Sequence, residues 1–127
     1  MDKDDFIFLT CDNQTIVAPN VIKNMCALLM SNEFPNNEVN LSGCKIATAV
    51  NLNILLTFCK NHSYKNPEII SVPIQTQLLK LSKIDEEFIS NLSFDLAVDL
   101  IKLSSKLECN SLEELCYAHM AVIIRSN

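Results

Sequence analysis

The chain has 127 residues, of which 49% are hydrophobic and 20% are charged, and its formal net charge is -5. This length fits one domain with a core of its own, and the composition excludes a disordered chain. The acidic balance argues against a nucleic-acid-binding protein, because phosphate contacts need clustered Lys and Arg side chains.

The N-terminal stretch MDKDDFIFL is acidic and lacks the basic segment and long apolar run of a secretory signal. No apolar run approaches the roughly 20 residues that span a bilayer. We therefore expect a cytoplasmic or nuclear protein that makes no membrane contact. In those compartments the six cysteines should stay reduced and pack as small hydrophobic side chains.

The first forty residues predict a small sheet and one helix. The β-rich runs FIFLT and TIVA flank a turn in which Asp12-Asn13 can supply positive φ angles, so we expect a β-hairpin. Apolar residues at helical spacing follow Pro19 and predict a helix. These residues are Val21, Ile22, Met25, Leu28 and Leu29. The EVNL segment is apolar at alternate positions and predicts a third short strand.

The middle of the chain predicts a second helix from Lys45 to Cys59, apolar around most of its circumference and therefore expected at the centre of the core. The KNHSYKNPE segment is a loop by composition, and prolines then favour extended chain until about Ile74. Residues 74–92 are ambiguous. Leu78, Leu79, Leu81 and Ile84 predict one short helix, and Phe88 and Ile89 begin a second short segment.

The last third of the chain predicts two helices. In the first, Leu96, Leu100, Leu103 and Leu107 follow one face, and Phe94, Ala97, Val98 and Ile101 follow another. The second begins at SLEE, where Ser111 as N-cap and Glu114 form a capping box. Its apolar residues are Leu112, Leu115, Cys116, Met120, Ile123 and Ile124. These faces carry more apolar residues than one core-facing stripe needs, so they either contact another molecule or only close the core.

Negative charge gathers in residues 85–114, which hold eight acidic residues and two lysines, whereas residues 1–84 hold seven of each sign. This segment is either a solvated helix surface or a surface that steers a basic partner toward the chain.

Two or three strands followed mainly by helices predict a small α+β domain. Its motifs resemble the Skp-type adaptors of cullin-RING ubiquitin ligases, which share the BTB/POZ fold with elongin C. FIFLTCDNQTIVA is similar to the opening hairpin of that family, and VNL with LNILLTFCKNH is similar to its short strand and following helix, with Phe58 in place of Trp. DEEF and DLIKLSSKLECNSLEEL resemble its later helices.

The resemblance implies a non-catalytic adaptor with a BTB/POZ (Skp-like) fold spanning residues 1–127, a three-stranded sheet against about five or six helices. It implies that one surface binds an F-box-like receptor and another binds a cullin N-terminal domain. The expected receptor contacts are Leu100, Leu103, Leu112, Leu115, Cys116, Met120, Ile123 and Ile124. The expected cullin contacts are Ser105, Lys106, Leu107 and Glu108, although Ser105 and Lys106 stand where the family has Asn-Tyr.

The chain also ends where Skp adaptors continue into further helices, so we expect it to lack those last helices. An alternative function is therefore a BTB-type self-association domain, forming a homodimer, or an elongin-C-like binder or decoy that engages one partner only.

Catalytic and metal sites find little support in the sequence. The single glycine, Gly43, leaves no phosphate-cradling loop. Cys59 and His62, and likewise Cys116 and His119, have Cys-x-x-His spacing and raise the hypothesis of a zinc site or a cysteine nucleophile. Because both cysteines lie in apolar stripes and no orienting third group is apparent, we favour buried thiols and expect no catalytic residue, metal or cofactor.

Overall fold

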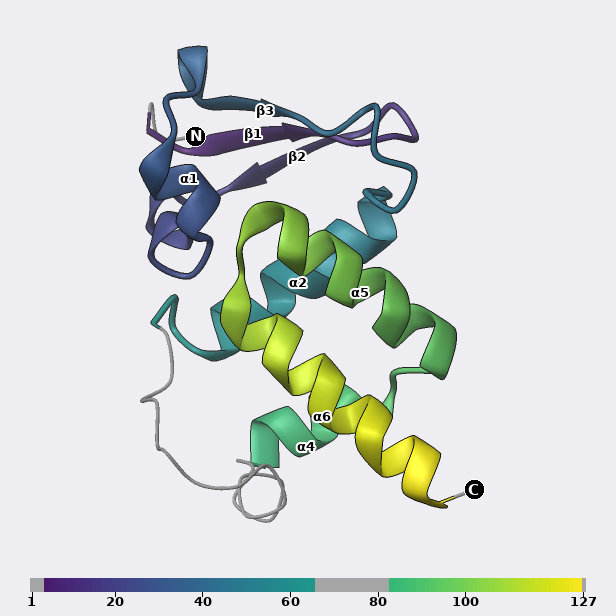
Figure 1. Cartoon of the computed structure of the whole chain (residues 1–127). Coiled ribbons are helices and arrows are strands. Elements are labelled where there is room, and N and C mark those ends of the chain that lie inside the picture. The colour runs from purple at the N-terminus through teal and green to yellow at the C-terminus, as the bar shows by residue number, and fades with distance from the viewer. Residues whose placement is uncertain (1–3, 66–82, 127) are drawn as a thin grey trace.

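The computed structural model of this chain describes residues 4–65 and 83–126. This part is an α+β structure, which confirms the predicted class. Its elements, in chain order, are β1 (Phe6–Leu9), β2 (Thr15–Ala18), the 3-10 helix η1 (Asn20–Asn24), α1 (Ala27–Ser31), the 3-10 helix η2 (Pro35–Asn37), β3 (Glu38–Asn40), α2 (Ala49–Asn61), α4 (Lys83–Ser90), α5 (Phe94–Leu107) and α6 (Asn110–Ser126). The sheet lies at one end of the structure and α4 at the other, with α2 and α5 between them (Figure 1).

The three strands form a mixed sheet in the order β2-β1-β3. The hairpin pairs β1 with β2 in antiparallel register, and β3 pairs with β1 in parallel. Asn13 has a φ of 62°, so one of the two turn residues expected at positive φ adopts it. Phe6, Phe8 and Val39 are buried, because alternate strand residues face the helices. The predicted hairpin and third strand are both confirmed.

The single helix predicted after Pro19 is wrong, since the chain forms η1 and α1 as two short helices. The break lies at Cys26, whose φ of -114° and ψ of 94° are extended rather than helical. Ile22 and Leu29 are still buried, so both short helices contribute to the core.

Helix α2 begins at Ala49, four residues later than predicted, because the Thr48 side chain caps it by accepting a hydrogen bond from the Asn51 backbone N–H. It buries Leu52, Leu55, Phe58 and Cys59. Val50, in contrast, is 66% exposed. Helix α2 therefore belongs to the core, as expected, but only along one side.

Helix α4 unites Ile84, Phe88 and Ile89 in one helix, where the sequence predicted two short segments. The expectations for Leu78, Leu79 and Leu81 lie outside the described residues. No helix in residues 4–65 and 83–126 combines the length and hydrophobicity needed to cross a membrane.

Helices α5 and α6 are antiparallel neighbours (Figure 1). The chain reverses between them through Glu108, which has a left-handed φ of 57°. The backbone N–H of Cys109 donates to the Ser104 carbonyl at 2.8 Å and that of Glu108 to the Ser105 carbonyl at 3.2 Å, the paired bonds of a Schellman motif. Helix α6 then starts at Asn110, so Ser111 lies inside the helix and the prediction that it is the N-cap is wrong.

Candidate functional site

The core of the chain encloses five of the eight predicted receptor contacts. These are Leu100, Leu103, Leu112, Leu115 and Cys116, each at most 8% exposed. All five belong to the hydrophobic core cluster that joins the sheet, α2, α5 and α6. Because a side chain with almost no accessible surface cannot contact a partner of the folded chain, their assignment to a partner surface is corrected.

The other three predicted contacts lie on the second half of α6 and keep accessible surface. Ile124 is 63% exposed, and Met120 and Ile123 are half-buried. Tyr117, which was not among the predicted contacts, is 55% exposed. Because Tyr117, Met120 and Ile124 are spaced i, i+3 and i+7, they form one stripe along the helix. We call Tyr117, Met120, Ile123 and Ile124 the distal α6 surface.

A polar contact anchors the same part of α6. The Nε2 atom of His119 lies 3.1 Å from the backbone carbonyl oxygen of Leu92, in the connection between α4 and α5. This contact places the inward side of α6 against that connection, which leaves the stripe with Tyr117 on the outward side.

The predicted cullin contacts also divide into exposed and buried residues. Ser105, Lys106 and Glu108 are exposed at the C-terminal end of α5. Leu107 is completely buried, so it belongs to the core and its assignment as a contact is corrected.

A groove of about 720 Å³ between α2 and α4 was not predicted from the sequence. Its apolar lining in the described residues comprises Val50, Ile54, Ile84, Phe88, Leu92 and Leu96. Asn53, Thr57 and Asn91 add polar groups to it. Of the apolar residues of α2 that the sequence placed in the core, Val50 and Ile54 thus line an open groove instead.

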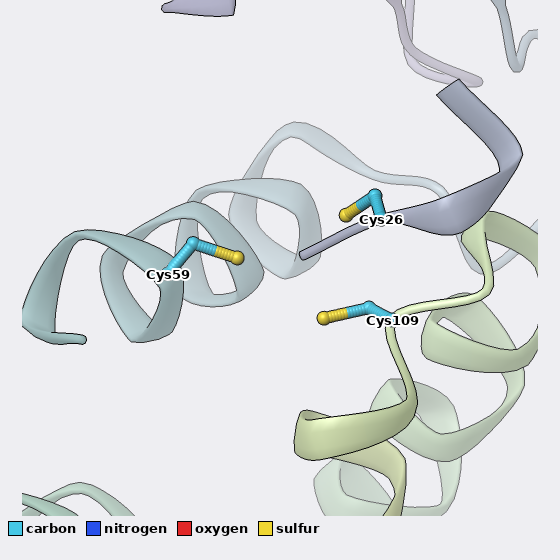
Figure 2. Close-up of side chains that lie close together, drawn as sticks. All are labelled: Cys26, Cys59 and Cys109. Carbon is cyan, nitrogen blue, oxygen red and sulfur yellow. The ribbon is translucent and has the colours of Figure 1, made fainter. Parts of the chain in front are cut away.

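Within the described residues, three buried cysteines bring their sulfur atoms close together. The Sγ atoms of Cys26, Cys59 and Cys109 all lie within 4.8 Å of one another, and none of the three residues is exposed. In Figure 2 the three sulfur atoms point toward a common space from three separate segments of the chain. We call these residues the thiol cluster.

Each cluster cysteine occupies the end of a helix. Cys26 is the N-cap residue of α1, Cys59 lies in the last turn of α2, and Cys109 directly precedes α6. The backbone N–H of Ala27 donates to the carbonyl of Glu108 at 3.2 Å, which joins the neighbours of Cys26 and Cys109. The cluster is therefore held by the backbone as well as by side-chain packing.

The three thiols differ in acidity because they share hydrogen bonds. Cys109 accepts hydrogen bonds from Cys26 and Cys59, and these contacts lower its pKa; a backbone N–H of Leu112 in the first turn of α6 acts in the same direction. Hydrogen bonding to Cys109 is the largest cause that raises the pKa of Cys26 and also of Cys59, and burial adds to both shifts. Burial raises the pKa of Cys116, outside the cluster, to about 12.

The two Cys-x-x-His pairs do not combine into one site. The Nε2 atom of His62 lies 2.8 Å from an Asp85 carboxylate oxygen, whereas His119 contacts Leu92. Within the described residues, the thiol cluster is the one group of three or more metal-ligating side chains with such close spacing. Of the four residues considered from the sequence, only Cys59 belongs to it.

Comparison of the chain with protein-family models and with curated proteins gives no match in either case.

Proposed function

We propose that this protein is a non-catalytic adaptor of a cullin-RING (SCF-type) ubiquitin ligase with a BTB/POZ, Skp-like fold, acting in the cytoplasm or nucleus. In this proposal the distal α6 surface binds an F-box-like helix of a substrate receptor, and the exposed end of α5 contacts a cullin. The motif resemblance and the order of elements, from the opening hairpin to the α5–α6 pair, support the assignment.

The single observation that carries the proposal is the exposed apolar stripe of α6. Tyr117 and Ile124 each keep more than half of their surface accessible. Burying one such side chain contributes roughly 1.5–3 kcal/mol before the costs of association. A partner helix that covers these two residues together with Met120 and Ile123 would gain several anchors of this size.

The positions of the two proposed surfaces suit an adaptor that bridges two partners. Glu108 lies just before the first residue of α6, and Ile124 lies close to its last residue. At 1.5 Å per residue, the path from Asn110 to Ile124 is about 21 Å. Two partner domains at opposite ends of one helix can therefore bind without competing for the same side chains.

The negative charge around the α5 end supports a basic partner there. Glu108 and Glu114 are exposed there, and Glu113 keeps part of its surface accessible. A basic cullin surface would be steered toward these groups, and its association rate would fall as salt increases.

The test compares two exposed apolar residues of similar accessibility. Ile124→Asp should weaken binding of an F-box helix by at least about tenfold, because it places a charge where an anchor is buried. Met30→Asp is the matched control, since Met30 is 61% exposed on α1. Calorimetry with an F-box peptide measures receptor binding, and pull-down with a cullin N-terminal domain measures cullin binding.

Binding of neither partner by the folded wild-type chain would contradict the adaptor proposal. A homodimer in light scattering that Ile124→Asp converts to a monomer would instead favour the self-association domain. Binding of the F-box peptide alone would favour the elongin-C-like binder.

A further inference from the structure

The thiol cluster has a geometry close to that of a metal site. Metal–thiolate bonds of about 2.3 Å place the sulfur atoms of a trigonal or tetrahedral site about 3.8–4.0 Å apart. The sulfur atoms of Cys26, Cys59 and Cys109 already lie within 4.8 Å of one another. A closure of about 1 Å or less brings them to coordination distance.

We propose that Cys26, Cys59 and Cys109 bind one thiophilic metal ion, with Cu⁺ favoured over Zn²⁺. Three thiolates complete the coordination of Cu⁺, whereas Zn²⁺ normally takes four ligands. Neither His62 nor Cys116 belongs to the group of sulfur and nitrogen atoms within 4.8 Å, so the chain supplies three ligands at this spacing. The site is distinct from the distal α6 surface and does not depend on the proposed adaptor function.

Ordinary buried cysteines provide the simpler explanation, but two features distinguish this cluster. First, its members come from three segments of the chain and direct their sulfur atoms at one another (Figure 2), whereas a buried hydrophobic side chain needs only any apolar neighbour. Second, Cys109 directly precedes α6, whose 17 residues give a helix N-terminus that favours a thiolate there. The second feature favours negative charge on Cys109 in an otherwise apolar interior.

Metal binding would have a clear structural consequence. The ion would replace the thiol protons, which are released to solvent, and would join α1, α2 and the α5–α6 connection at one point. Since the unfolded chain does not hold these cysteines together, the ion would bind the folded state preferentially and raise its stability.

The test uses the reduced full-length chain with Cu⁺ and Zn²⁺ in separate titrations against a chromophoric chelator. We expect saturation at one ion per chain and an increase in Tm with the bound ion. Cys26→Ala and Cys109→Ala should each lower the affinity by more than the roughly 10- to 100-fold that loss of an outer-shell partner causes. Cys44→Ala is the control, because Cys44 is a partly exposed thiol outside the cluster.

Two further measurements keep the test decisive if a variant does not fold. X-ray absorption of the metal-loaded wild type should count three sulfur neighbours at about 2.3 Å. His62→Ala and Cys116→Ala should retain binding; loss of affinity as large as that of Cys109→Ala would overturn the three-thiolate site in favour of four ligands. Absence of stoichiometric binding of either ion to the wild type, or equal loss with Cys44→Ala, would overturn the proposal altogether.

Discussion

The two halves of α6 have similar apolar content and different surroundings. In the first half, Leu112, Leu115 and Cys116 are at most 8% exposed. In the second half, Val122 is 42% and Ile124 is 63% exposed. The same apolar spacing thus gives core residues in the first turns of α6 and surface residues in its last turns. The pattern alone therefore does not distinguish a core residue from an interface residue.

The length of the neighbouring helix accounts for part of this difference. Helix α5 has 14 residues and α6 has 17, which correspond to about 21 Å and 25 Å. Because the two helices are antiparallel, the second half of α6 runs alongside the beginning of α5, where Phe94 is itself 43% exposed. Burial near the end of α6 thus depends in part on how far its neighbours extend.

The largest expected effect comes from truncating one side chain in each half of α6. Leu112→Ala should lower the free energy of unfolding by about 2–5 kcal/mol, since it leaves a cavity in the core. Ile124→Ala should change it by less than about 0.5 kcal/mol, because that side chain is mostly in water already. Urea unfolding followed by circular dichroism measures both values.

Equal destabilisation by the two substitutions would contradict the division of α6 into a core half and a surface half. Leu115→Ala is a second check on the core half, because Leu115 is only 8% exposed. Its effect on the free energy of unfolding should be closer to that of Leu112→Ala than to that of Ile124→Ala.

Local patterns predicted much of the fold. The β-rich runs FIFLT and TIVA and the alternation in EVNL identified the strands, and the helical spacing of apolar residues identified α5 and α6, because these signals depend only on neighbouring residues. The break at Cys26 was missed, since the apolar spacing from Val21 to Leu29 continues through it. An extended cap residue leaves no periodic signal.

Tertiary contacts decided what the sequence could not predict. The thiol cluster joins residues from α1, α2 and the start of α6, and no short motif links Cys26 with Cys59 or Cys109. The exposure of Val50 depends on which elements reach that side of α2. Whether the distal α6 surface binds a receptor is still a prediction.

A smaller effect of opposite sign is expected at Ser104, on the face of α5 that is fully enclosed. Its hydroxyl is buried and has no hydrogen-bond partner in the part of the chain that the structure describes. Because an unsatisfied buried hydroxyl is destabilising, Ser104→Ala should raise the free energy of unfolding by about 1 kcal/mol. Ser105→Ala, at an exposed position, is the control and should change it by only a few tenths. A clear loss of stability in Ser104→Ala, measured in urea, would mean that its hydroxyl does have a partner.

The smallest effect concerns Glu108, which sets the direction of α6 and the position of Cys109. A left-handed φ of 57° is unfavourable by about 1–2 kcal/mol for a residue with a Cβ, and glycine avoids most of this strain. After subtraction of the greater freedom of glycine in the unfolded chain, Glu108→Gly should stabilise the protein by about 0.5–1 kcal/mol. Lys106→Gly provides the matched control: it introduces the same residue two positions earlier, inside α5, where helical backbone gives glycine no advantage, and should destabilise by about 0.5–1 kcal/mol. If Glu108→Gly raises the Tm and Lys106→Gly lowers it, the left-handed turn is the cause. If both variants have a lower Tm, the Glu108 side chain stabilises the protein by more than its strained backbone destabilises it.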